Sequence, residues 1–127
     1  MKENIIRDKS FAFALRIVKM YKYLTLEKKE YVLSKQLLRS GTAIGALIRE
    51  AEHAESKADF IHKLAIAQKE ANETDYWIDL LFQSEYLKEK EYLSINSDIK
   101  ELNKILASII ISSKNNLWIE NGYDFNL

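Results

Sequence analysis

The chain has 127 residues with no proline, no cysteine and only three glycines, and its composition is 47% hydrophobic and 30% charged. This length suits one domain with a buried core, the scarcity of turn residues favours long helices over a sheet, and the lack of cysteine excludes disulfides and thiol chemistry. The net charge is zero, but residues 1–39 hold ten Lys/Arg and four Asp/Glu whereas residues 40–127 hold nine and fifteen, so the two parts carry +6 and −6.

The first predicted helix runs from about residue 8 to residue 24, with Asp8 or Ser10 as its N-cap. Apolar residues at helical spacing form a stripe that we expect to face the core. The stripe consists of Phe11, Ala14, Leu15, Val18 and Tyr21, and it is widened by Phe13, Ile17, Met20 and Leu24.

The second predicted helix spans residues 27–54, with Thr25 available as a cap. Gly41 and Gly45 lie in its interior, where each glycine costs about 1 kcal/mol relative to alanine. Such a cost is typical of close packing against another helix, and a kink is the competing interpretation. Its apolar stripe is Leu33, Leu37, Gly41, Ile44, Ile48 and Ala51.

The third and fourth predicted helices span residues 57–85 and 94–113, and both carry apolar residues at alternating steps of four and three. Ser56 and Asp59 resemble a capping box before the third helix, and Ser94 or Ser97 is the expected start of the fourth. This spacing is the seam of helical bundles. The seams are Phe60, Leu64, Ala67, Ala71, Thr74, Ile78 and Leu81, then Ile95, Ile99, Leu102, Leu106 and Ile109.

Residues 114–127 form a predicted tail that has no helical period and contains an Asn-Gly turn signal. We expect this tail either to pack a Trp or Tyr onto the bundle or a neighbour, or to be loose. Four helices with short connections predict one all-α domain, an antiparallel up-down-up-down four-helix bundle.

Two spacings resemble half of a carboxylate–histidine metal motif, Glu50-x-x-His53 and Asp59-x-x-His62. A di-metal bundle needs two further carboxylates at the same level from the other helices, and residues 102–113 contain none. We therefore expect exposed histidines, no metal site and no cofactor.

Glu70, Glu73 and Trp77 form a second stripe beside the seam of the third helix, and Arg39 and Arg49 are candidate counter-charges. Half-buried carboxylates need charged partners, so this pattern favours a structural polar network within the bundle or between copies. Catalysis would require a cleft and a nucleophile that the sequence does not provide.

Basic residues interleaved with Tyr21, Tyr23 and Tyr31 fill the first third of the chain. Phosphate attraction combined with base stacking is a physically sensible use of this pattern, although a solvated helix face has the same composition. The candidate nucleic-acid-binding residues are Arg7, Lys9, Arg16, Lys19, Lys22, Lys28, Lys29 and Lys35.

Several segments together resemble the 23S rRNA-intervening-sequence proteins, a bacterial family of four-helix bundles. The resemblance extends from residue 7 to residue 114 and is carried by Gln36-Leu37-Leu38-Arg39-Ser40-Gly41-Thr42, Ile44-Gly45-Ala46, Glu50-Ala51, Asp59-Phe60, Ile66-Ala67, Glu70-Ala71, Glu73-Thr74 and Tyr76-Trp77. This family is related to the accessory proteins of diversity-generating retroelements, which are pentamers thought to bind nucleic acid and a reverse transcriptase. The resemblance therefore implies a homopentameric ring.

Two positions depart from that family, which usually has Ser where this chain has Ala43 and Asn where it has Leu47. With Ser40 and Glu50 these positions form one stripe on the second helix. The apolar replacements favour helix or subunit packing as the role of this stripe.

Taken together, the sequence predicts a non-enzymatic, homo-oligomeric bundle that offers a basic surface to RNA, DNA or a nucleic-acid enzyme such as a reverse transcriptase. The alternative hypothesis is a purely structural self-assembling protein. No segment approaches the roughly 18 apolar residues of a membrane helix, and the N-terminus does not resemble a signal peptide, so we expect a cytoplasmic protein without a membrane partner.

Overall fold

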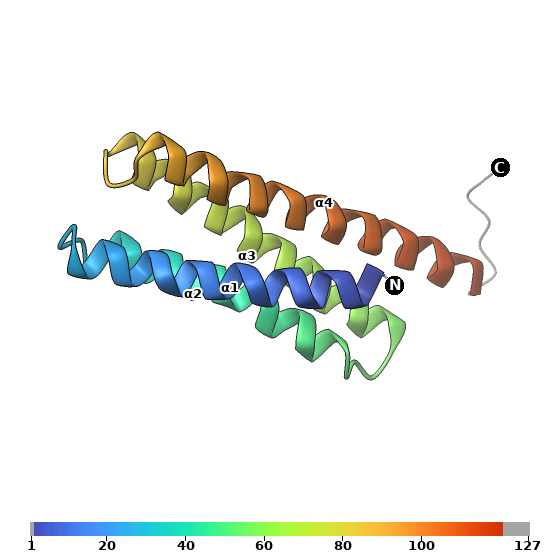
Figure 1. Ribbon diagram of the computed structural model, residues 1–127. Helices are drawn as coiled ribbons and strands as arrows, with labels where there is room; N and C mark the ends of the chain where they lie inside the picture. Colours follow the sequence, from blue (N-terminus) through green and yellow to red (C-terminus); the bar gives the residue numbers. More distant parts are fainter. Residues whose placement is uncertain (1, 121–127) are drawn as a thin grey trace.

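A computed structural model describes the chain from residue 2 to residue 120, with the side chains of residues 5–117. It contains four helices, α1 (Lys2–Leu26), α2 (Leu33–Ala51), α3 (Lys57–Gln83) and α4 (Glu89–Glu120), and no strand within residues 2–120 (Figure 1). Each helix packs against the next one in the chain, and α1 also packs against α4. The predicted antiparallel four-helix bundle is confirmed.

The core lies along the seams predicted for α3 and α4. Phe60 is partly exposed and packs at the edge of the core, next to the buried Ile61. The remaining seam positions are all buried: Leu64, Ala67, Ala71, Thr74, Ile78 and Leu81 on α3, and Ile95, Ile99, Leu102, Leu106 and Ile109 on α4.

The predicted core face of α1 is partly wrong, because its centre is displaced by about one residue of helical rotation. Phe11 and Leu15 are 49% and 54% exposed. The buried stripe contains Phe13, Ile17 and Leu24, which the wider prediction included, together with Ile6 and Ser10, which it did not. The helix is apolar on two adjacent faces, so periodicity alone does not choose between them, and the approach of α2 decides which face is covered.

The start of α1 and its connection to α2 also differ from prediction. Ser10 is not a cap: it lies inside α1, and its hydroxyl donates to the carbonyl of Arg7 at 3.0 Å. Thr25 is likewise inside α1 and donates to the carbonyl of Tyr21 at 2.9 Å. The chain turns at Lys29, whose φ is +55°.

The helix α2 begins at Leu33 rather than residue 27 because the side chain of Glu30 caps it. The Glu30 carboxylate accepts hydrogen bonds from the backbone N–H groups of Val32, Leu33 and Ser34, at 3.0, 3.0 and 2.7 Å. These groups would otherwise lack partners at the helix N-terminus. At its other end α2 stops at Ala51 instead of residue 54.

The predicted cap of α3 is confirmed, since the Ser56 hydroxyl accepts from the N–H of Asp59 at 3.0 Å. The end of α3 forms a Schellman motif, in which Tyr86 N–H donates to the Leu81 carbonyl and Glu85 N–H donates to that of Phe82. Glu85 takes the left-handed position with φ +70°, which glycine usually occupies.

The helix α4 is longer than predicted at both ends. It begins near Glu89, where Glu91 accepts the N–H of Lys88 at 2.8 Å, and not at Ser94 or Ser97. It continues past residue 113 to Glu120 because Leu117 extends the apolar spacing and packs against the core. The Asn-Gly turn and the aromatic residues expected to pack from the tail, Trp118 and Tyr123, lie outside the described side chains.

None of the described helices is long and apolar enough to cross a membrane.

Candidate functional site

The charge difference along the sequence becomes a difference between two layers of the bundle. Figure 1 shows α1 beside α2 and α3 beside α4. Helices α1 and α2 hold nine Lys/Arg and three Asp/Glu, whereas α3 and α4 hold seven and ten. The α1–α2 layer is therefore cationic and the α3–α4 layer anionic, and opposite charges meet where the layers join.

Three of the eight predicted nucleic-acid-binding cations are engaged within the bundle. Lys9 and Arg16 on α1 pair with Glu101 and Asp98 on α4, with Lys9 Nζ 3.1 Å from its partner. Arg16 also donates to the Ser94 hydroxyl at 2.8 Å. Arg7 Nε lies 3.3 Å from Glu52, in the turn after α2.

The other five predicted cations gather around the connection between α1 and α2, and we call them the lysine edge. All are exposed, and none forms an ion pair with another residue in the described part of the chain. One of them, Lys28, lies over the Tyr23 ring with its Nζ 5.9 Å from the ring centroid. The lysine edge consists of Lys19, Lys22, Lys28, Lys29 and Lys35.

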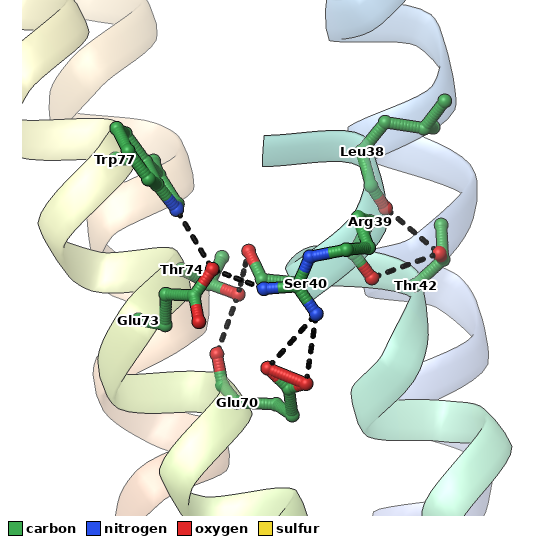
Figure 2. A network of polar contacts seen from close by, with 8 residues as sticks. All are labelled: Leu38, Arg39, Ser40, Thr42, Glu70, Glu73, Thr74 and Trp77. Atoms are coloured by element: carbon green, nitrogen blue, oxygen red, sulfur yellow. Dashed lines mark hydrogen bonds and ion pairs between the residues drawn. The ribbon is translucent and has the colours of Figure 1, made fainter. Parts of the chain in front are cut away.

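A polar network joins α2 to α3 (Figure 2). The Arg39 guanidinium reaches across to Glu70, at 3.1 and 3.3 Å from its two carboxylate oxygens, and also contacts Glu73. Trp77 donates its indole N–H to Glu73 at 3.0 Å. The structure thus brings together three of the four residues predicted for this network.

These contacts shift the pKa values of the charged groups in the network. Hydrogen bonds from Arg39 to Glu70 and Glu73 raise the pKa of the guanidinium, with Glu70 as the larger cause. The pKa of Glu73 is lowered, first by the indole of Trp77 and then by Arg39. Arg39 and Glu73 therefore both stay charged at physiological pH, which suits a permanent ion pair between helices better than proton transfer.

Two buried hydroxyls lie beneath this ion pair. Thr74 Oγ1 is 2.9 Å from Ser40 Oγ and 2.8 Å from the Glu70 carbonyl oxygen. A carbonyl only accepts and a hydroxyl has one proton, so when Thr74 donates to the carbonyl, Ser40 donates to Thr74. The pair satisfies polar groups at fully buried positions on both helices.

Arg49 does not join the network. Its guanidinium lies over the Phe11 ring, 5.0 Å from the centroid, on the α1 side of α2. There α1 comes close to α2 at both glycines: a Cβ at Gly41 would be 2.9 Å from Ile17, and one at Gly45 would be 3.4 Å from the Ser10 carbonyl oxygen.

The two histidine motifs do not converge. His53 lies in the turn after α2 and His62 on α3, and both side chains are exposed. Within the described residues, no group of three or more His, Asp or Glu side chains is arranged to hold a metal ion.

Sequence reasoning missed several polar residues that the fold positions. Glu30 is buried and caps α2, Lys100 pairs with Asp75 at 2.7 Å, and Tyr92 donates to Asp79 at 2.7 Å. The last contact raises the pKa of the Tyr92 phenol. Of these residues, only Glu30 lies next to a helix start in the sequence. Composition alone does not locate that helix start, so the capping role of Glu30 was not predicted.

Comparison with known proteins agrees with this architecture. A family model described as "23S rRNA-intervening sequence protein" matches residues 2–108. A solved structure of a protein of unknown function from the S23 ribosomal protein family of Bacteroides thetaiotaomicron VPI-5482 is 62% identical, with 87% of this chain and 98% of that chain covered and a TM-score of 0.86. No curated protein matches the chain. The chain belongs to the 23S rRNA-intervening sequence protein family.

Proposed function

We propose that this protein acts by binding rather than catalysis, as a homo-oligomeric bundle that holds RNA or DNA at its lysine edge. The observation that carries the proposal is the separation of two kinds of cation. Arg7, Lys9 and Arg16 are paired with acids of the same chain, whereas the lysine edge has no acid partner among the described residues.

The pairing matters because nucleic-acid affinity comes largely from cations that can neutralise phosphates. A paired arginine must first leave its carboxylate, whereas an exposed lysine only exchanges water and counterions. Residues 19–35 contain five lysines and two glutamates, and one of these, Glu30, is buried under the start of α2. The exposed charge at this edge is therefore strongly positive.

Self-assembly is the second part of the proposal. Phe11 and Leu15 on α1 are half exposed, and Phe11 lines a groove between α1 and α2 together with the small residues Ala14 and Ala46. We propose that a second copy covers this apolar surface, because the anionic α3–α4 layer complements the cationic α1–α2 layer. The family resemblance suggests five copies in a ring, and a reverse transcriptase or another nucleic-acid enzyme as a further partner.

A titration of labelled RNA and DNA tests the binding proposal. The variant Lys22→Gln/Lys29→Gln/Lys35→Gln removes three charges of the lysine edge. Its matched control, Lys69→Gln/Lys104→Gln/Lys114→Gln, removes three exposed charges from α3 and α4. We expect the first variant to bind at least about tenfold more weakly at low salt and the control to bind like wild type. Equal losses, or no binding by wild type, would contradict the proposal.

Light scattering across ionic strength tests whether the protein assembles. Together with the titration, it distinguishes the proposed function from the alternative one. An oligomer that binds no nucleic acid at low salt would favour the purely structural self-assembling protein. A monomer at every salt concentration would contradict assembly, and Leu15→Glu should produce that monomer if the α1 surface is the interface.

A further inference from the structure

The connection between α1 and α2 exposes large apolar side chains that the bundle does not use. Leu26, Tyr31 and Val32 are 66%, 58% and 72% exposed. They account for three of the nine large hydrophobic side chains exposed in the described part of the chain, within seven consecutive residues. Such clustering marks an interaction surface more often than scattered exposure does.

The 26–32 turn is held rigidly in this outward conformation. At its start, the N–H groups of Glu27 and Glu30 donate to the carbonyls of Tyr23 and Leu24 at 2.9 and 3.0 Å. At its end, the buried Glu30 carboxylate fixes the N–H groups of Val32 and the following two residues. The backbone on either side of the Tyr31 ring is therefore fixed before any partner arrives, which lowers the entropic cost of binding.

The charge around the turn favours an anionic partner. Lys28 and Lys29 lie within the turn, Lys22 and Lys35 lie a few residues before and after it, and all four are exposed. Glu27 is the single exposed carboxylate between residues 19 and 35. An exposed aromatic ring in a lysine-rich segment is the combination that single-strand-binding surfaces use, with the ring stacking on a base and the lysines following the phosphates.

We propose that the 26–32 turn selects single-stranded nucleic acid, with an unpaired base stacked on Tyr31 and neighbouring phosphates held by Lys28, Lys29 and Lys35. The inference rests on the proposed function and specifies its ligand class. An anionic bilayer is a weaker match, because membrane docking buries a broad apolar face by several ångströms. Here only three large apolar side chains are exposed, and the exposed, charged Glu27 lies among them in the sequence.

The chain offers a matched control, because Tyr76 on α3 is also 58% exposed. Tyr76 packs edge-on against Trp77 in the anionic layer, with ring centroids 5.0 Å apart. Tyr31→Ala and Tyr76→Ala therefore remove equally exposed rings from surfaces of opposite charge. The probes are a labelled uridine oligonucleotide of about 20 nucleotides, which exceeds the site of one binding module, and an RNA duplex of the same length.

Tyr31→Ala should weaken single-strand binding by about tenfold, because the variant loses the stacking contact with one base. Tyr31→Phe should bind like wild type, because the ring is kept. Duplex binding should be unchanged by Tyr31→Ala, and Tyr76→Ala should change neither affinity. Circular dichroism melting of each variant establishes that the bundle is intact.

The outcomes separate this inference from the proposed function. If Tyr31→Ala binds as tightly as wild type while the three-lysine variant binds weakly, stacking is wrong and the lysine edge stands. If Tyr76→Ala loses as much affinity as Tyr31→Ala, the turn is not the selective element. Tighter binding of wild type to phosphatidylserine vesicles than to the oligonucleotide would replace the inference with a membrane surface.

Discussion

Ile17 on α1 packs so closely onto Gly41 on α2 that a Cβ atom at the glycine would lie 2.9 Å from two of the isoleucine side-chain carbons. Both carbons are attached directly to the branched Cβ of Ile17, and because a β-branched side chain in a helix has one strongly preferred rotamer, they have little freedom to move aside. Gly41→Ala should therefore lower the free energy of unfolding by about 1–2 kcal/mol, because overpacking outweighs the gain in helix propensity. Urea denaturation measures this change.

Gly45→Ala is the control for that prediction. Its added Cβ would lie 3.4 Å from the Ser10 carbonyl oxygen, which is ordinary contact. We expect no loss of stability and a gain of up to about 1 kcal/mol from helix propensity. Equal effects of the two substitutions would mean that close helix approach does not explain Gly41.

Glu30 should make stability depend on acid pH. Burial opposes its ionisation, but backbone N–H donors of Ser34, Leu33 and Val32 together lower its pKa below the ordinary 4.5. A lowered folded-state pKa gives stability that is complete above the unfolded pKa and is lost as pH falls through the folded value. Glu30→Gln should therefore cost about 1–2 kcal/mol at neutral pH, and progressively less below about pH 4.

Thermal melts of wild type and Glu30→Gln between neutral and acid pH test this prediction. Glu27→Gln, on an exposed glutamate in the same turn, should follow wild type throughout. A constant difference between Glu30→Gln and wild type at all pH values would show that the carboxylate charge does not stabilise α2.

Glu85 offers a stabilising substitution. Its φ of +70° places a residue with a side chain in the left-handed region, which costs about 1 kcal/mol relative to glycine. Glu85→Gly should raise the unfolding free energy by up to this amount, despite the greater freedom of glycine in the unfolded chain. Gln83→Gly, two residues earlier and still helical, should have the opposite sign, and chemical denaturation distinguishes the two.

The buried Ser40–Thr74 pair should behave as a coupled unit. Thr74→Val leaves the buried Ser40 hydroxyl without this partner, which costs about 1–3 kcal/mol. Adding Ser40→Ala should recover part of that loss, so the double variant should be more stable than the sum of the two single changes predicts. Additive losses in denaturation experiments would mean that the hydroxyls do not interact across the α2–α3 seam.

Much of the fold could be predicted because α3 and α4 repeat apolar residues with an unbroken four-three rhythm. The centre of the buried face of α1 could not be predicted, because Phe11 and Leu15 are as apolar as Phe13 and Ile17. Only the position of α2 decides which of these side chains are buried. The helix ends were also hidden. Left-handed turns fall on Lys29 and Glu85 rather than glycine, and no local pattern marks them.

The candidate site was less predictable than the fold. Composition identified the basic residues but not which of them are paired, because Arg16 meets Asp98 across 82 positions of sequence. The Arg39–Glu70 contact could be predicted, because the two residues lie beside the apolar stripes along which α2 and α3 must pack together. Arg49 was assigned to the same network by charge alone, and the helix instead directs it to the Phe11 ring.

The salt dependence of single-stranded RNA binding tests the central claim most directly. Each phosphate contact contributes about −0.7 to the slope of log affinity against log salt. Lys22→Gln/Lys29→Gln/Lys35→Gln should therefore flatten the wild-type slope by about 2, whereas Lys69→Gln/Lys104→Gln/Lys114→Gln should leave it unchanged. The same slope for all three proteins would contradict the assignment of the lysine edge as the nucleic-acid surface.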